Sequence, residues 1–231
     1  MKKNKFKQEH ILKMNTTDQY RTVDELFKRS QPNSVYYTML VLSAFIVTAG
    51  LLLNNAPIVI GGMLVTPVLT PLLVIALGLA TGEIAAIKGT ALLTLKSFVI
   101  IVAAAVLLTF IFGPTKVEPI IGDSLRTIVL YFIVALTSGV AATFAWTRKE
   151  IADVLPGIAI AVSLVPPLGL VGIGISTLNV AMMRFNFLLF LFNLLGIIVG
   201  SLVIFSLLKF YRSDKKVKAD SEELKEMTEK K

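Results

Sequence analysis

The chain has 231 residues, 55% of them hydrophobic, and carries 23 Lys and Arg against 15 Asp and Glu, a formal net charge of +8. The charges gather at the two ends: the first 34 residues hold 8 basic and 4 acidic side chains, and the last 23 hold 8 and 6. The 174 residues between them hold only 12 charges, too few to solvate a globular surface. This composition excludes a soluble globular domain and predicts an all-α integral membrane protein.

Several kinds of site are excluded by residue type. Cysteine is absent and the single histidine, His10, lies in the charged N-terminal end, so we expect no disulfide and no metal. The sequence has no phosphate-binding glycine loop, paired histidines or Gly-x-Ser-x-Gly elbow, and we therefore expect no enzyme activity and no cofactor. The basic residues flank apolar segments without a nucleic-acid module, which favours the lipid bilayer over nucleic acid as the partner.

Six apolar segments are long enough to cross about 30 Å of hydrocarbon. They connect through short loops, one of them around Glu83 and Lys88, and together they form a predicted membrane domain over residues 35–208. The predicted spans are 35–53, 56–80, 91–112, 125–146, 153–176 and 185–208.

Two charged tails flank this domain, a basic one over residues 1–34 and a mixed one over residues 209–231. In the first tail, Thr22 to Glu25 has the pattern of a capping box, and Tyr20, Val23 and Phe27 share a helical face. The tail is either a short amphipathic helix lying on the membrane surface or a disordered basic segment. We expect the second tail to be solvated, or helical without a core.

Six spans place both termini on one side of the membrane. With this topology 19 Lys and Arg fall on the side of the termini, and 3 fall on the other side, namely Lys116, Arg126 and Arg184. Lys96, near the start of the third span, reaches the first side by snorkelling. Basic residues accumulate on the cytoplasmic side, so we predict a multi-pass protein of the inner (plasma) membrane with both termini cytoplasmic.

The second and fifth spans share a proline motif. A shift of 100 residues aligns residues 61–67 with 161–167, and Leu-Val-x-Pro matches in both. Each motif lies in the middle span of a three-span set, and an odd number of spans brings the second copy into the membrane from the opposite side. We therefore predict two inverted three-helix repeats, with Pro/Gly-broken second and fifth spans.

The prolines of these motifs remove backbone donors inside the membrane. Two of them within five residues break a helix, and the carbonyls that they free need partners from protein, water or a bound ion. Two interpretations are open. The prolines either kink two helices whose small residues let neighbours pack closely, or mark paired broken helices with an ion or substrate site near the midplane.

The second interpretation predicts a pathway between the two broken helices, lined by backbone carbonyls, hydroxyls and amides. Asn54 and Asn55 also fit a simple tight turn between the first two spans, and Asn193 fits a helix–helix hydrogen bond. The candidate pathway residues are Asn54, Asn55, Gly61, Gly62, Thr66, Pro67, Thr70, Pro71, Ser163, Pro166, Pro167, Gly169 and Asn193.

Residues 49–67 resemble the signature of the "uncharacterised hydrophobic domain" family of bacterial and archaeal membrane proteins. That signature has Gly-Leu-x-x-Asn, then Ile-Gly-x-Met-Leu-x-x-Pro, followed by a second proline and a glycine-rich end. The resemblance covers roughly residues 35–210; it implies a multi-pass membrane protein and brings no substrate or activity. The matching residues are Gly50, Leu51, Asn54, Ile60, Gly61, Met63, Leu64, Pro67, Pro71 and Gly78.

From these residues we expect a small secondary transporter or channel-like permease for a small solute or ion, assembled as a homo-oligomer. The alternative comes from another class of protein. It is a non-transporting membrane scaffold or regulatory subunit that binds a partner protein through its tails and glycine faces.

Overall fold

The computed structural model describes residues 14–113, 125–148 and 164–229, and all regular structure within these ranges is helical. Four of the helices are long and apolar enough to cross a membrane, or five if the bent pair α3 and α4 counts as one span. The prediction of an all-helical chain with several apolar helices of membrane-spanning length is confirmed.

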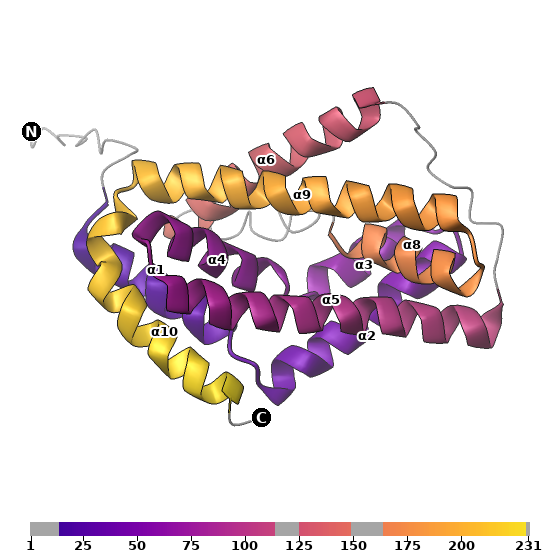
Figure 1. Cartoon of the computed structure of the whole chain (residues 1–231), viewed down its shortest axis with the longest axis horizontal. Coiled ribbons are helices and arrows are strands. Elements are labelled where there is room, and N and C mark those ends of the chain that lie inside the picture. Colours follow the sequence, from indigo (N-terminus) through magenta and orange to yellow (C-terminus); the bar gives the residue numbers. More distant parts are fainter. Residues whose placement is uncertain (1–13, 114–124, 149–163, 230–231) are drawn as a thin grey trace, which may run out of the picture.

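Of the long helices, α2 and α5 run in one direction along the molecule, and α6 and α9 run in the opposite direction (Figure 1). The helix bounds are α1 (Thr16–Arg29), α2 (Ser34–Leu52), α3 (Ala56–Val65), α4 (Leu69–Thr81), α5 (Ile84–Phe112), α6 (Leu125–Thr147), α8 (Val165–Ser176), α9 (Val180–Leu207), the 3-10 helix η2 (Phe210–Ser213) and α10 (Asp214–Glu229).

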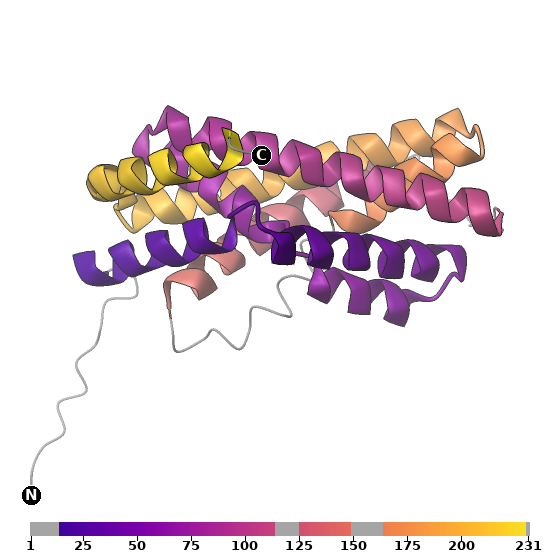
Figure 2. The same cartoon turned by 90° about the horizontal axis from the view of Figure 1, so that it is seen from below.

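The helices α1 and α10 lie at the same end of the molecule (Figures 1 and 2). We call this the terminal end, and we call the opposite end, where α2 meets α3 and α8 meets α9, the distal end. The helices α5 and α9 run almost the full length between the two ends, in opposite directions. Half-length α4 lies toward the terminal end and half-length α8 toward the distal end (Figure 1).

Short polar side chains begin several of these helices by accepting a hydrogen bond from a backbone N–H of the first turn. Asn33 accepts from Tyr36 N at 2.8 Å, and Asn179 accepts from Met182 N at 3.0 Å. Glu83 caps α5 in the same way, so Lys88 lies inside a helix and the loop predicted around it is wrong. Since nothing after Glu83 breaks the helix, α5 begins well before the predicted start of the third span.

The second predicted span is interrupted in the middle. The helix α3 ends at Val65, α4 begins at Leu69, and the two axes differ in direction by 55°. Thr66 takes an extended backbone conformation, with φ −70° and ψ 132°, because the ring of Pro67 disfavours the helical region for the residue before it. Pro71 lies in the first turn of α4, where its missing N–H breaks no helical hydrogen bond.

The N-terminal helix α1 differs from the prediction in two respects. It begins after Asn15, and the Thr22 hydroxyl donates to Asp18 O at 2.9 Å within the helix, so the predicted capping box is wrong. Its apolar face packs on the protein, chiefly against α4 and α10: Val23 is fully buried and Phe27 is 4% exposed, whereas Tyr20, the third residue of the predicted stripe, is 40% exposed.

The C-terminal helix α10 also has a core of its own, contrary to the expectation of a tail without one. Its buried side chains are Val217, Ser221 and Leu224, and the helix packs against α5 and α1. The charged tail is therefore a structural part of the terminal end.

Glycines let α6 and α9 approach closely. A Cβ on Gly200 would lie 2.2 Å from Leu136 O, and one on Gly139 would lie 2.4 Å from Ile197 O. Both obstacles are backbone atoms, which cannot move aside as a flexible side chain can. Ser201 Oγ donates to Gly139 O at 3.3 Å across the same interface.

We expect Gly200→Ala to destabilise the fold by about 1–3 kcal/mol, because the added methyl group forces two helix backbones apart. The matched control is Gly61→Ala in α3, where nothing lies within 4 Å of the new Cβ and the helix gains propensity. The measurement is the Tm of both variants in detergent, and a Gly200→Ala protein as stable as Gly61→Ala would contradict the interface.

Candidate functional site

The break between α3 and α4 lies one short helix away from the distal turn. The ten residues of α3, at about 1.5 Å each, separate Thr66 from that turn by about 15 Å. In a hydrocarbon layer about 30 Å thick, no bulk water can satisfy the backbone groups that an interrupted helix leaves unpaired.

The hydroxyls at the break are placed differently from one another. Thr70 Oγ1 donates to Pro67 O at 3.2 Å and to Arg29 O at 3.4 Å, so it joins α4 to the end of α1. The Thr66 hydroxyl is buried and has no hydrogen-bond partner among the described residues. A buried hydroxyl without a partner costs about 1–3 kcal/mol, which makes Thr66 the most conspicuous polar group of the break.

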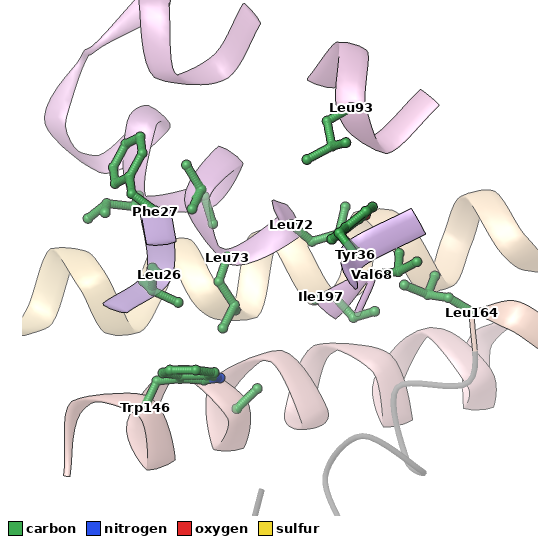
Figure 3. Close-up of a cluster of buried hydrophobic side chains, with 14 of the residues drawn as sticks. Leu26, Phe27, Tyr36, Val68, Leu72, Leu73, Leu93, Trp146, Leu164 and Ile197 are labelled. Carbon is green, nitrogen blue, oxygen red and sulfur yellow. The ribbon is translucent and has the colours of Figure 1, made fainter. Parts of the chain in front are cut away.

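The start of α8 lies next to this break. The helix begins with Pro166 and Pro167 in its first turn, and it packs on α3, α2, α5 and α9. Leu164, just before α8, and Val68, just before α4, both belong to the main buried cluster and lie close together in Figure 3. Gly169 faces α2, where a Cβ would meet the Leu51 side chain at 2.8 Å.

Not all predicted pathway residues join this group. Asn54 and Asn55 are exposed in the distal turn: Asn54 has a φ of 49°, and Asn55 accepts from Ile58 N at 3.2 Å as the cap of α3. Gly61 is exposed, and Gly62 is buried against α2, where its carbonyl accepts from Ser43 Oγ at 2.9 Å. Ser163 lies outside the described residues.

Several helix bounds in the first half of the chain recur in the second half at a constant separation in sequence. A shift of 96 residues carries Leu69, the start of α4, onto Val165, the start of α8, and Ile84, the start of α5, onto Val180, the start of α9. The C-terminal ends of α2, α4 and α5 fall within one residue of the ends of α6, α8 and α9 under the same shift. The backbone agrees as well: Gly113 and Lys209, which follow α5 and α9, both have positive φ.

This separation differs from the one in the alignment predicted from sequence. A shift of 100 residues pairs Pro67 with Pro167, whereas the helix bounds pair Pro71 with Pro167 and Gly78 with Gly174. The four-residue Leu-Val-x-Pro match is one helical turn out of register with the helices that contain it. In the 96-residue register the positions equivalent to Thr66 and Pro67 lie outside the described residues.

The 96-residue register also relates two buried polar residues, of which only one was among the predicted pathway residues. Under the 96-residue shift, Ser97 of α5 occupies the position equivalent to Asn193 of α9. Both side chains are buried near the middle of their helices, at 0% and 2% exposure. Tyr36 OH and Ser97 Oγ share a hydrogen bond of 2.8 Å between α2 and α5. Tyr36 and Ser97 were not among the predicted pathway residues, and the 96-residue shift is the sequence signal that would have found Ser97.

The apolar helices define a helical membrane protein, and one of its apolar segments is interrupted by a short non-helical stretch between α3 and α4. The sequence model described as "Domain of unknown function (DUF389)" matches residues 63–199. The chain belongs to this family, and the predicted resemblance to a family of uncharacterised membrane proteins is confirmed.

One relative in this comparison is the "Uncharacterized protein MJ0678" of Methanocaldococcus jannaschii. It is 27% identical over 191 residues, which cover 81% of this chain and 57% of that protein. The chain thus spans less than two thirds of the length of this curated relative. No solved structure matches the chain.

The distal turn allows the structural role of Asn54 to be tested. Because its φ is positive, we expect Asn54→Gly to keep the stability of the protein, and Asn54→Val to lower it by about 1–2 kcal/mol. The measurement is the Tm of the two variants in detergent. Equal losses for both would show that the Asn side chain itself, and not the backbone conformation, matters at this position.

Proposed function

We propose that this protein is a small secondary transporter or channel-like permease, with a pathway at mid-depth where the α3–α4 break meets the start of α8. The observation that carries the proposal is the break itself, a non-helical segment about 15 Å from the distal turn. Interrupted helices at this depth expose carbonyls and N–H groups in a place where lipid offers them no partner, and transporters use such groups to hold solutes and ions.

The buried hydroxyl of Thr66 supports the same proposal. This hydroxyl can donate to, and accept from, a solute or a water, because none of the described residues forms a hydrogen bond with it. Thr70, four residues later, is already bonded to two carbonyls and is therefore a fixed part of the frame.

An inverted repeat of six spans is part of the proposal. It is supported by the 96-residue recurrence of helix bounds and by matching neighbours: α4 packs on α5 and α9, and α8 packs on α9 and α5. It is supported further by direction, since α5 and α9 run in opposite senses and the half-length helices α4 and α8 lie toward opposite ends (Figure 1). Repeats of this kind place a site between their two halves.

With this topology and the excess of basic residues on the side of the termini, we propose that the protein lies in the inner membrane with both termini in the cytoplasm. Reporter fusions test it: a periplasm-active reporter inserted after Asn55 should be active, and the same reporter inserted after Lys149 should be inactive. Activity at both positions, or at neither, would refute the six-span arrangement.

The function is tested by flux in proteoliposomes that contain the pure protein, with potassium, sodium, chloride and a panel of labelled amino acids and organic acids as probes. We expect at least one probe to pass faster than through protein-free liposomes. Thr66→Val should lower that flux by about tenfold, because it removes one hydrogen bond to the solute at nearly constant side-chain volume.

The matched control is Thr109→Val in α5, which removes a buried hydroxyl that donates to Ala105 O at 2.7 Å, far from the break. This variant should keep the wild-type flux. Flux that never exceeds the protein-free background would contradict transport and favour the scaffold hypothesis, and equal losses in the two variants would contradict a role for Thr66.

A further inference from the structure

At the terminal end α1 and η2 pack on α4, and α10 contacts α4 while packing chiefly on α5. The inner face of α1 is fully buried at Val23 and Leu26, and α1 packs against α4, α10 and η2. Figure 3 shows Leu26 and Phe27 on the same side of the cluster as Leu72 and Leu73 of α4, which are also fully buried. The apolar helix α4 is therefore covered by the two ends of the chain.

Buried hydrogen bonds join these ends to each other. Gln19, which is 5% exposed, donates from Nε2 to Leu208 O at 2.9 Å and accepts from Ser213 Oγ at 3.1 Å. One side chain of α1 thus holds both the end of α9 and the start of the C-terminal helices.

A charged bridge lies on the outside of the same contact. Lys216 of α10 pairs with Asp24 of α1 and, at 3.0 Å, with Asp220 of its own helix. The hydrogen bond to Asp24 raises the pKa of Lys216, so its ammonium group stays charged at neutral pH. Asp24 is 60% exposed, and a cavity of about 520 Å³ between the two helices borders both carboxylates, so dissolved salt reaches the bridge.

The end of α1 also reaches the break. Arg29 O accepts from Thr70 Oγ1, three residues after Pro67, and the Arg29 guanidinium lies 5.1 Å from the centre of the Trp146 ring at the end of α6. A movement of α1 away from α4 would therefore break a contact with the first turn after the break.

The helix α8 is the counterpart of α4 in the 96-residue register, and it has different neighbours. It lies toward the distal end against α2, α3, α5 and α9, far from α1 and α10 (Figure 1). The helices α4 and α8 thus occupy equivalent positions in the two halves of the chain. They differ in that the two ends of the chain cover α4 and not α8.

We propose that α1 and α10 form a clasp, closed by Lys216 between Asp24 and Asp220, that holds α4 in place and so restricts movement at the α3–α4 break. The clasp loosens when salt screens its charges. Its effect on solute flux rests on the proposed function, whereas its effect on α4 does not.

The clasp is tested by amide hydrogen exchange of the full-length protein in detergent micelles, with peptides from α4 and α8 followed in the same sample. We expect Lys216→Glu to speed the exchange of α4 by about two- to fivefold, the range for loss of partly exposed ion pairs, and to leave α8 unchanged. In the wild type, 1 M salt should speed the exchange of α4 selectively, because charges are then screened within about 3 Å.

Two variants serve as controls. Lys215→Glu makes the same charge change at an exposed neighbour that forms no ion pair among the described residues, and it should leave both helices unchanged. Asp24→Lys combined with Lys216→Glu places the cation on α1 between two carboxylates of α10, and it should restore the slow exchange of α4.

Exchange of α4 that responds neither to Lys216→Glu nor to salt would overturn the clasp, as would equal acceleration of α4 and α8, which indicates loss of global stability. Flux is measured separately with the same variants. Faster α4 exchange without any flux in the wild type would support the clasp and refute the transport proposal.

Discussion

Hydrogen bonding of the backbone in lipid is the constraint on which the rest of this fold depends. A helix satisfies its own N–H and C=O groups, and an interrupted helix does not, so an interruption persists only where protein surrounds it. At Thr66 to Val68 the chain meets this requirement in part: Val68 and the Thr66 hydroxyl are buried, and Thr70 donates to the free Pro67 carbonyl. The helices around the break are therefore part of its chemistry as well as of its packing.

Much of the fold could be predicted from the sequence, because the relevant signals are local. Apolar length predicted helices of membrane-spanning length, and Pro67 predicted a kink or a break, which the structure shows as the 55° change of direction between α3 and α4, since a proline acts on the residue directly before it. Asn54 was correctly interpreted as tolerant of the left-handed region, where it has a φ of 49°. These effects depend on one or two neighbouring residues each.

The long-range features were harder to predict. The register of 96 residues gives only a weak sequence signal, because α4 and α8 share few identical residues. The short Leu-Val-x-Pro match at a shift of 100 residues is a stronger local signal. The docking of α1 and α10 escaped notice because their buried residues, such as Leu26 and Val217, are separated by charged ones in sequence. Which surface covers an amphipathic helix is decided by packing between distant segments, and composition alone carries no such information.

The glycines described above mark where helix backbones approach one another most closely. Backbone-close contacts join α2 to α3 through Gly50 and Gly62, α5 to α8 through Gly172, and α6 to α9 through Gly139 and Gly200. The glycine of α4, Gly78, packs on the first turn of α5, where a Cβ would meet the Ile87 side chain at 2.8 Å and Glu83 O at 3.2 Å. The closest backbone contacts thus lie within three helix pairs, whereas α4 is held by its buried side chains, between the break at Pro67 and the turn at Gly82.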